Sequence, residues 1–195
     1  MQTITALTRF TLAAAVMGMS GCLYDFDFGE DGWDEDPYYY DDYTELEASG
    51  GVLEGELGLV QVDGDARIYE ASDWGYGASI ELRNNGVGGT GMNRLDIDGV
   101  DISELEAGTY ESTGYTATSS TGDPNFSVMG CSGPSDGNWD YDVSADHVSV
   151  VVTELDPWTV RIDWTATFPE TRTYGRGEST EIPSNTSTGS VVVVR

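Results

Sequence analysis

From Gly51 onward, apolar and polar residues alternate with a period of two in a series of short runs. The clearest run covers residues 159–168, where every second residue is apolar. Successive side chains of a β-strand point to opposite faces, so this run predicts a strand with one buried face and one solvated face. Trp164, in the middle of the apolar series, is therefore expected in the core. The apolar residues of this run are Val160, Ile162, Trp164, Ala166 and Phe168.

About ten such segments, each bounded by turn residues, predict an all-β domain. Turn signals such as Asp63-Gly64 and Asp156-Pro157 separate them. This spacing is typical of an antiparallel β-sandwich of roughly 8–10 short strands, with a closed β-barrel as the alternative. The last run, Val191–Val194, predicts a buried and central terminal strand. The predicted strands are Val52–Val62, Ala66–Ala71, Ala78–Arg83, Met92–Asp98, Thr109–Thr118, Phe126–Cys131, Trp139–Val143, His147–Glu154, Thr159–Phe168 and Ser190–Val194.

Helical signals are weak beyond the first 21 residues. Ile102–Ala107 predicts at most one helical turn, which Gly108 would end. The six residues Gly86–Gly91 match the glycine fingerprint of dinucleotide-binding folds. That fingerprint needs a helix to begin at the glycines, because the helix N-terminus binds the pyrophosphate. Met92–Asp98 alternates as a strand instead, so we interpret the glycines as a hairpin loop.

The first residues of the chain have the three successive regions of a secretory signal peptide. Arg9 supplies a positive charge, an apolar run extends from Phe10 to Met19, and two small residues follow. The apolar run is too short to span a bilayer. We therefore expect the protein to be exported, with residues 1–21 removed.

The four residues Met19-Ser20-Gly21-Cys22 resemble the lipobox of bacterial lipoproteins, in which the signal peptidase cuts before a cysteine that carries the lipid. This resemblance implies that Cys22 is the mature N-terminus and holds fatty acyl chains such as palmitate. Leu23 stands where an Asp retains some lipoproteins in the inner membrane, so the resemblance favours the outer membrane. The alternative is an exported protein without lipid. Several acyl chains together give stable anchoring, since each buried CH₂ contributes about 0.8 kcal/mol.

The rest of the chain resembles small all-β bacterial lipoproteins of uncharacterised function. The residues that carry this weaker resemblance are Gly108-Thr109-Tyr110 and the strand ending Trp164-Thr165-Ala166-Thr167-Phe168. The resemblance implies an architecture for residues 51–195 and assigns no activity to them.

Residues 22–50 predict a disordered acidic tether between the anchor and the sandwich. Like charges at this density repel and extend a chain, and a flexible segment of this length spans roughly 30 Å. The interleaved aromatic residues are unusual for a spacer, and they could pack on the domain, on a partner or at the membrane interface. The acidic residues are Asp25, Asp27, Glu30, Asp31, Asp34, Glu35, Asp36, Asp41, Asp42, Glu45 and Glu47; the aromatic residues are Tyr24, Phe26, Phe28, Trp33, Tyr38, Tyr39, Tyr40 and Tyr43.

The charge of the chain excludes some classes of partner. It has 35 acidic and 8 basic residues, all of the latter arginine, for a net charge of −27. Nucleic acid is not an expected partner, because binding it requires a basic patch that neutralises phosphates. An anionic membrane surface would repel the domain, so we expect membrane attachment through the N-terminal lipid. High acidity also keeps a protein soluble, and it is common on surfaces adapted to high salt.

The two cysteines allow two arrangements. If Cys22 is acylated, Cys131 has no partner within the chain and is expected as a small buried residue. The alternative is a Cys22–Cys131 disulfide, which requires that Cys22 carries no lipid. A catalytic Cys131–His147 pair has no family signature around it, and we do not expect one.

Calcium is the cofactor considered, because several Asp-x-Asp strings fall at predicted turns. Asp96, Asp98 and Asp101 are the leading candidates for a metal site, and 63–65 and 140–146 are weaker ones. None matches the EF-hand loop, since Val100 occupies the third ligand position after Asp96 and Asp98. We therefore expect solvated acidic loops and predict no cofactor.

Exposed aromatic residues mark the candidate ligand contacts. Trp74 and Tyr76 lie in a predicted loop, and Trp158 lies at a predicted hairpin tip. Such residues suggest recognition of a ligand, although they also cap the ends of cores. A carbohydrate-active enzyme would need, in addition, two carboxylates facing each other across a cleft.

These features together predict a lipid-anchored protein of the bacterial cell envelope with a non-enzymatic binding or structural domain. No catalytic residues are assigned, and an envelope protein or a glycan is the expected class of partner. The alternatives are a calcium-stabilised surface or adhesion domain and, less favoured, a carbohydrate-active enzyme.

Overall fold

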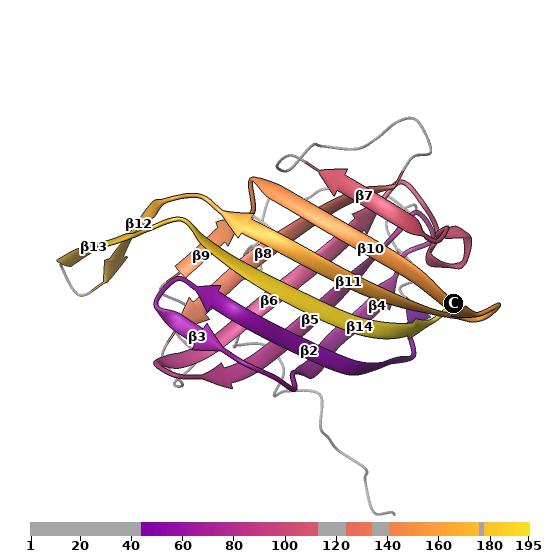
Figure 1. The fold of residues 1–195 in the computed structure, drawn as a ribbon, viewed down its shortest axis with the longest axis horizontal. Coiled ribbons are helices and arrows are strands. Elements are labelled where there is room, and N and C mark those ends of the chain that lie inside the picture. Colours follow the sequence, from indigo (N-terminus) through magenta and orange to yellow (C-terminus); the bar gives the residue numbers. More distant parts are fainter. Residues whose placement is uncertain (1–43, 113–123, 134–140, 176–177) are drawn as a thin grey trace, which may run out of the picture.

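The computed structural model describes residues 44–112, 124–133, 141–175 and 178–195. The predicted signal peptide, Cys22 and residues 23–43 of the predicted tether lie outside these ranges. Fourteen strands and one short 3-10 helix are found in the described residues, and twelve of the strands form two six-stranded sheets packed face to face (Figure 1). All strand pairs are antiparallel, and the two sheets are not closed into a barrel. The predicted antiparallel sandwich is therefore confirmed, and the barrel alternative is wrong.

The first sheet, which we call sheet A, is built around the long central pair β5 and β6. Its strands follow the chain order closely, so most neighbours are joined by short connections. In spatial order, sheet A consists of β1 (Thr44–Glu45), β4 (Arg67–Asp73), β5 (Gly77–Gly86), β6 (Gly89–Asp98), β8 (Asn125–Gly133) and β9 (Tyr141–Ser144).

The second sheet, sheet B, brings the C-terminal strand into its centre. In spatial order it consists of β3 (Val60–Val62), β2 (Ala48–Leu57), β14 (Asn185–Val194), β11 (Thr159–Phe168), β10 (His147–Asp156) and β7 (Gly108–Ser112). A separate hairpin of β12 (Thr171–Gly175) and β13 (Glu178–Ile182) continues from β11 and leads into β14, extending from one end of the sandwich (Figure 1).

The core lies between the two sheets and follows the predicted alternation. In β11 every second side chain is buried, and Trp164 is 2% exposed, as the sequence indicated. The inner residues of β5 and β6 meet this layer from sheet A. The central position of β14 is also confirmed, and within the predicted run Val191–Val194 the side chains of Val191 and Val193 are fully buried. The largest fully buried side chains include Trp164, Phe126, Phe168, Leu53, Leu57, Ile80, Leu82 and Ile162.

Several predicted strands have different bounds in the structure. The predicted run Val52–Val62 is two strands, because Gly58 at φ 61° turns the chain between β2 and β3. Strand β2 begins at Ala48 and β1 at Thr44, so residues 44–50 of the predicted tether belong to the sheets. Strands β12 and β13 were not predicted from the sequence. Parts of the predicted strands Thr109–Thr118 and Trp139–Val143 lie outside the described residues.

The two weak helical signals have different outcomes: the glycine-rich residues lie in strands, and Ile102–Glu104 form one short helical turn. The glycine-rich residues 86–91 form the β5–β6 hairpin, with Gly86 opposite Gly89 and Gly88 at φ 101°. No helix follows, so the interpretation as a hairpin is confirmed. The predicted turn after Asp101 is a 3-10 helix, η1 (Ile102–Glu104), which Asp101 caps by accepting a hydrogen bond from the Ser103 amide. Within the part of the chain that the structure describes, no helix has the length and hydropathy of a membrane span.

Candidate functional site

The predicted aromatic contacts lie on turns at one end of the sandwich. Tyr76 is 81% exposed on the β4–β5 turn, and Trp158 is 71% exposed on the β10–β11 turn. Both turns are held by backbone and carboxylate hydrogen bonds, such as the Trp158 amide donating to Asp156 Oδ1 at 2.9 Å. Trp74 is half-buried, and its indole packs so closely on Gly77 that an added Cβ would lie 2.9 Å from Nε1. Two of the three aromatics are thus available to a ligand.

The three leading calcium candidates do not converge on a common point. Asp96 Oδ1 accepts hydrogen bonds from Ser79 Oγ at 2.7 Å and Arg94 Nε at 2.9 Å. Asp101 caps η1. Burial, followed by the negative charge of Asp96, raises the pKa of Asp98. Among the described residues, no group of three or more His, Cys, Asp or Glu side chains is placed to hold a metal ion.

We therefore expect calcium to leave the stability of the protein unchanged. A ligand that binds only the native state raises the free energy of unfolding by about 2.7 kcal/mol at a hundredfold excess over its dissociation constant. The melting temperature should be the same in millimolar calcium and in chelator, as measured by differential scanning calorimetry at constant ionic strength. A rise in melting temperature with calcium but not with magnesium would contradict this expectation.

Cys131 and His147 lie on opposite sides of the molecule. Cys131 is on the outer face of sheet A, beside Met92, whereas His147 is on the outer face of sheet B, where its Nε2 lies 3.2 Å from Glu111 Oε2. Two packed sheets, about 10 Å apart, separate them. Cys131 is fully buried, as expected, but it is disulfide-bonded, so the expectation of an unpaired Cys131 is wrong. A Cys131–His147 catalytic pair is therefore excluded by geometry.

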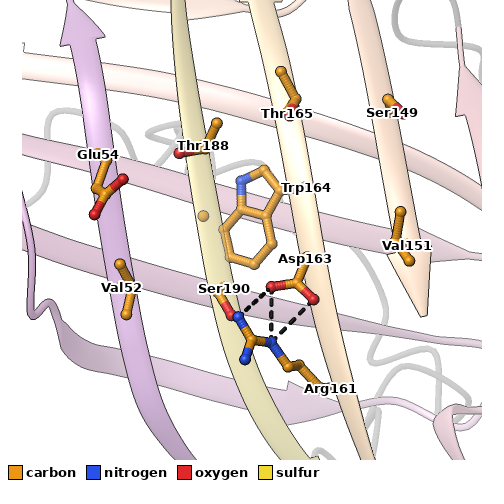
Figure 2. Close-up of a pocket in the computed structure, with 11 residues that line it drawn as sticks. Val52, Glu54, Ser149, Val151, Arg161, Asp163, Trp164, Thr165, Thr188 and Ser190 are labelled. Carbon is orange, nitrogen blue, oxygen red and sulfur yellow. Dashed lines mark hydrogen bonds and ion pairs between the residues drawn. The ribbon is translucent and has the colours of Figure 1, made fainter. Parts of the chain in front are cut away.

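A shallow pocket of about 390 Å³ lies on the outer face of sheet B (Figure 2). It crosses four strands, and hydroxyl groups and an ion pair line it together with two valines. The lining residues are Val52 and Glu54 from β2, Thr188, Gly189 and Ser190 from β14, Arg161, Asp163, Trp164 and Thr165 from β11, and Ser149 and Val151 from β10. Sequence reasoning did not identify this pocket, because it depends on which strands become neighbours.

The charged groups of the pocket are held in fixed positions. Arg161 and Asp163 form a bidentate ion pair along β11 (Figure 2). Arg161 Nε lies 2.9 Å from Asp163 Oδ1 and 3.0 Å from Oδ2, and Arg161 Nη2 lies 2.8 Å from Oδ1. On β10, Ser149 Oγ donates to Glu111 Oε1 at 2.8 Å. These contacts orient several donors and acceptors on the outer face of the sheet.

The floor of the pocket is shaped by a glycine. Gly189 is directly opposite Trp164 in the β11–β14 register, and the indole packs against the glycine backbone. Beneath the floor, Asn93 is fully buried and accepts hydrogen bonds from Ser187 Oγ at 2.7 Å and from Trp164 Nε1 at 3.4 Å. The pocket floor is therefore tied to sheet A through a polar contact in the core.

The pocket does not have the arrangement that the carbohydrate-active alternative required. Neither Trp74 nor Trp158 lines it. Of its two carboxylates, Asp163 is engaged by Arg161 on both oxygens, and Glu54 lies two strands away on β2. This surface presents hydrogen-bonding groups around a shallow hollow.

The outer face of sheet A has a different environment, because most outward residues of its central strands β5, β6 and β8 are buried or half-buried. Glu81 is 6% exposed and forms an ion pair with Arg83, and Arg94 pairs with Asp96. Burial raises the pKa of Glu81, and the hydrogen bond from Arg83 opposes the rise. Burial also raises the pKa of Asp142 on β9. The two outer faces of the sandwich are thus unlike: polar residues in the middle of sheet A are buried or half-buried, whereas many of those around the sheet B pocket are exposed.

The fold and these surfaces define the class of protein: an all-β sandwich of two antiparallel sheets with a shallow polar pocket on one outer face. No protein family model, curated protein or solved structure matches the chain.

Proposed function

We propose that this protein is exported, held at the bacterial cell envelope by lipid on Cys22, and uses its β-sandwich as a non-enzymatic binding or structural module. The observation that carries the anchor is the order of Arg9, the apolar run and Met19-Ser20-Gly21-Cys22, which resembles a lipobox. Leu23 favours the outer membrane over the inner membrane. A net charge of −27 supports attachment through lipid, because the domain itself would be repelled by an anionic surface.

The solvated face of sheet B supports the binding role. Its pocket combines the fixed Arg161–Asp163 pair with hydroxyls from three strands, and Val151 adds an exposed apolar side chain. Such a surface suits hydrogen bonding to an envelope protein or a glycan. The exposed aromatics Tyr76 and Trp158 offer a second, smaller contact at the end of the sandwich.

The disulfide of Cys131 argues against a lipid anchor on Cys22. Cys22 is the only other cysteine in the sequence, and one sulfur cannot form both a thioether to lipid and a disulfide. In the lipoprotein pathway that the lipobox implies, acylation of Cys22 precedes cleavage and leaves Cys131 as a buried thiol.

The experiment compares the wild-type chain with Cys22→Ser and, as the matched control, Cys131→Ser, each expressed with its own leader in a Gram-negative bacterium. If Cys22 is acylated, intact mass spectrometry finds lipid on residue 22 of the wild type and of Cys131→Ser, and both fractionate with membranes. Cys22→Ser is then unprocessed or released. A non-acylated wild type whose mass and thiol count show a disulfide would overturn the anchor and leave an exported, soluble sandwich.

A further inference from the structure

The strand register arranges the side chains of the sheet B pocket in two rows that cross the strands (Figure 2). Residues paired in the register lie side by side, about 4.8 Å apart from one strand to the next. One row has three hydroxyl groups and a carboxylate at its end, and the other has a valine at each end. The first row is Glu54, Thr188, Thr165 and Ser149, and the second is Val52, Ser190, Asp163 and Val151. A ligand that lies across the strands therefore meets hydroxyls along one side and apolar side chains at both ends of the other.

The charges of this pocket favour a neutral ligand. Among its lining residues, all of which the structure describes, Arg161 is the one cation, and its Nε donates to both carboxylate oxygens of Asp163 at 2.9 Å and 3.0 Å. An anionic ligand would therefore meet a neutralised guanidinium on a chain of net charge −27. A cationic ligand would meet Glu54, but this side chain is exposed, and exposed ion pairs contribute little to binding.

The backbone beneath the pocket is already paired, which disfavours an extended peptide as the ligand. Strand β14 pairs with β2 and β11, and β11 pairs with β14 and β10, so their amide and carbonyl groups form ladders on both sides. An extended peptide joins a sheet at an unpaired edge strand. The pocket lies on the four inner strands of sheet B, away from its edges β3 and β7. The ligand must therefore be recognised through side chains.

The side chains of the pocket suit a ligand that is rich in hydroxyl groups. Thr165 and Thr188 are exposed, and each hydroxyl can both donate and accept a hydrogen bond. Asp163, although paired with Arg161, keeps lone pairs that can accept from a ligand. Sugar rings carry hydroxyls on their edges and apolar C–H groups on their faces. The two rows supply the partners of both, since Val151 is 42% exposed at one end.

The dimensions of the rows match those of an extended sugar chain. The strand spacing of about 4.8 Å is close to the rise of one residue in a chain of equatorially linked pyranoses. Four strands cover about 14 Å from the first to the last, which gives room for about three sugar residues.

We infer that the sheet B pocket binds an extended, neutral oligosaccharide that lies across the strands. Its hydroxyls bond to the row that contains Thr188 and Thr165, and its ring faces pack on Val52 and Val151. This inference rests on the proposed binding role of the sandwich and names the ligand of that same site. It does not rest on the anchor, because a chain without lipid on Cys22 keeps the same pocket.

The test titrates tetrasaccharides of β-1,4-linked glucose, mannose and N-acetylglucosamine into the exported protein, purified in detergent, by isothermal titration calorimetry. The double variant Thr165→Val/Thr188→Val removes two hydroxyls of the first row and keeps side chains that suit a strand. The matched control, Thr167→Val/Thr186→Val, removes the next pair of threonines on the same two strands, outside the pocket. We expect the pocket variant to lose affinity about tenfold or more, and the control to change it by less than about twofold.

Ser190→Ala serves as a second pocket variant if the double variant does not fold, which its circular dichroism spectrum would show. Tetragalacturonate and tetralysine are the anionic and cationic probes, and neither should bind in a way that the pocket variants weaken. The inference is overturned if none of the neutral tetrasaccharides binds at millimolar concentration, or if the pocket and control variants lose affinity equally. A charged probe that binds at the pocket more tightly than the neutral ones would also overturn it. A protein that fractionates with membranes but binds no sugar would leave the proposed anchor intact, so the two failures are distinguishable.

Discussion

Gly189→Ala is expected to destabilise the sandwich by about 3 kcal/mol, at the upper end of the range for overpacked cores. A Cβ at this position would overlap two ring carbons of Trp164. The indole is buried and the glycine lies in the centre of sheet B, so neither group can move aside without disturbing β11 and β14. Urea unfolding followed by circular dichroism measures the loss in the free energy of unfolding.

The matched control is Thr188→Ala, one residue earlier on the same strand and exposed on the outer face. We expect this control to change the free energy of unfolding by no more than about 0.5 kcal/mol. In a double-mutant cycle, Trp164→Leu should relieve part of the strain of Gly189→Ala. The coupling energy should then be at least about 1 kcal/mol. Strictly additive losses would show that the ring and the glycine are not in contact.

The alternation of apolar and polar residues was sufficient to predict most of the sandwich, because this alternation depends only on the local geometry of each strand. Strand β11 has its predicted bounds, Thr159–Phe168, and the predicted strands in β5, β6 and β10 lie within the observed ones. The β12–β13 hairpin escaped prediction because residues 171–182 are mainly polar and contain no apolar alternation. The split between β2 and β3 was missed because the run Val52–Val62 has apolar residues on both sides of Gly58, whose positive φ makes the turn.

Strand order and the sites could not be predicted, because both depend on pairing between distant segments. Nothing in the sequence near Trp164 indicates that Gly189 will lie opposite it, or that β2 will pair with β14. The pocket on sheet B follows from those pairings. The aromatic residues, in contrast, were predicted from local turn signals, and the structure leaves Tyr76 and Trp158 exposed while Trp74 packs on Gly77.

Substitution of Asn93 should be nearly as destabilising as substitution of Gly189, because Asn93 makes buried polar contacts between the two sheets. Its side-chain oxygen accepts hydrogen bonds from Ser187 and Trp164 of sheet B, and its amide nitrogen donates to the Met92 carbonyl oxygen at 3.2 Å. Asn93→Leu would leave two buried donors unsatisfied. Each such group costs about 1–3 kcal/mol, so we expect a total loss of about 3 kcal/mol.

The design that isolates this cause adds Ser187→Ala to Asn93→Leu. Ser187→Ala removes one of the two unsatisfied hydrogen-bond donors. The double variant should therefore be more stable than Asn93→Leu alone, although Ser187→Ala by itself should be destabilising. Denaturant unfolding of the four proteins gives the sign of the coupling directly. If the double variant were the least stable of the four, loss of packing volume would explain the effect of Asn93→Leu, and the polar contact between the sheets would contribute little to stability.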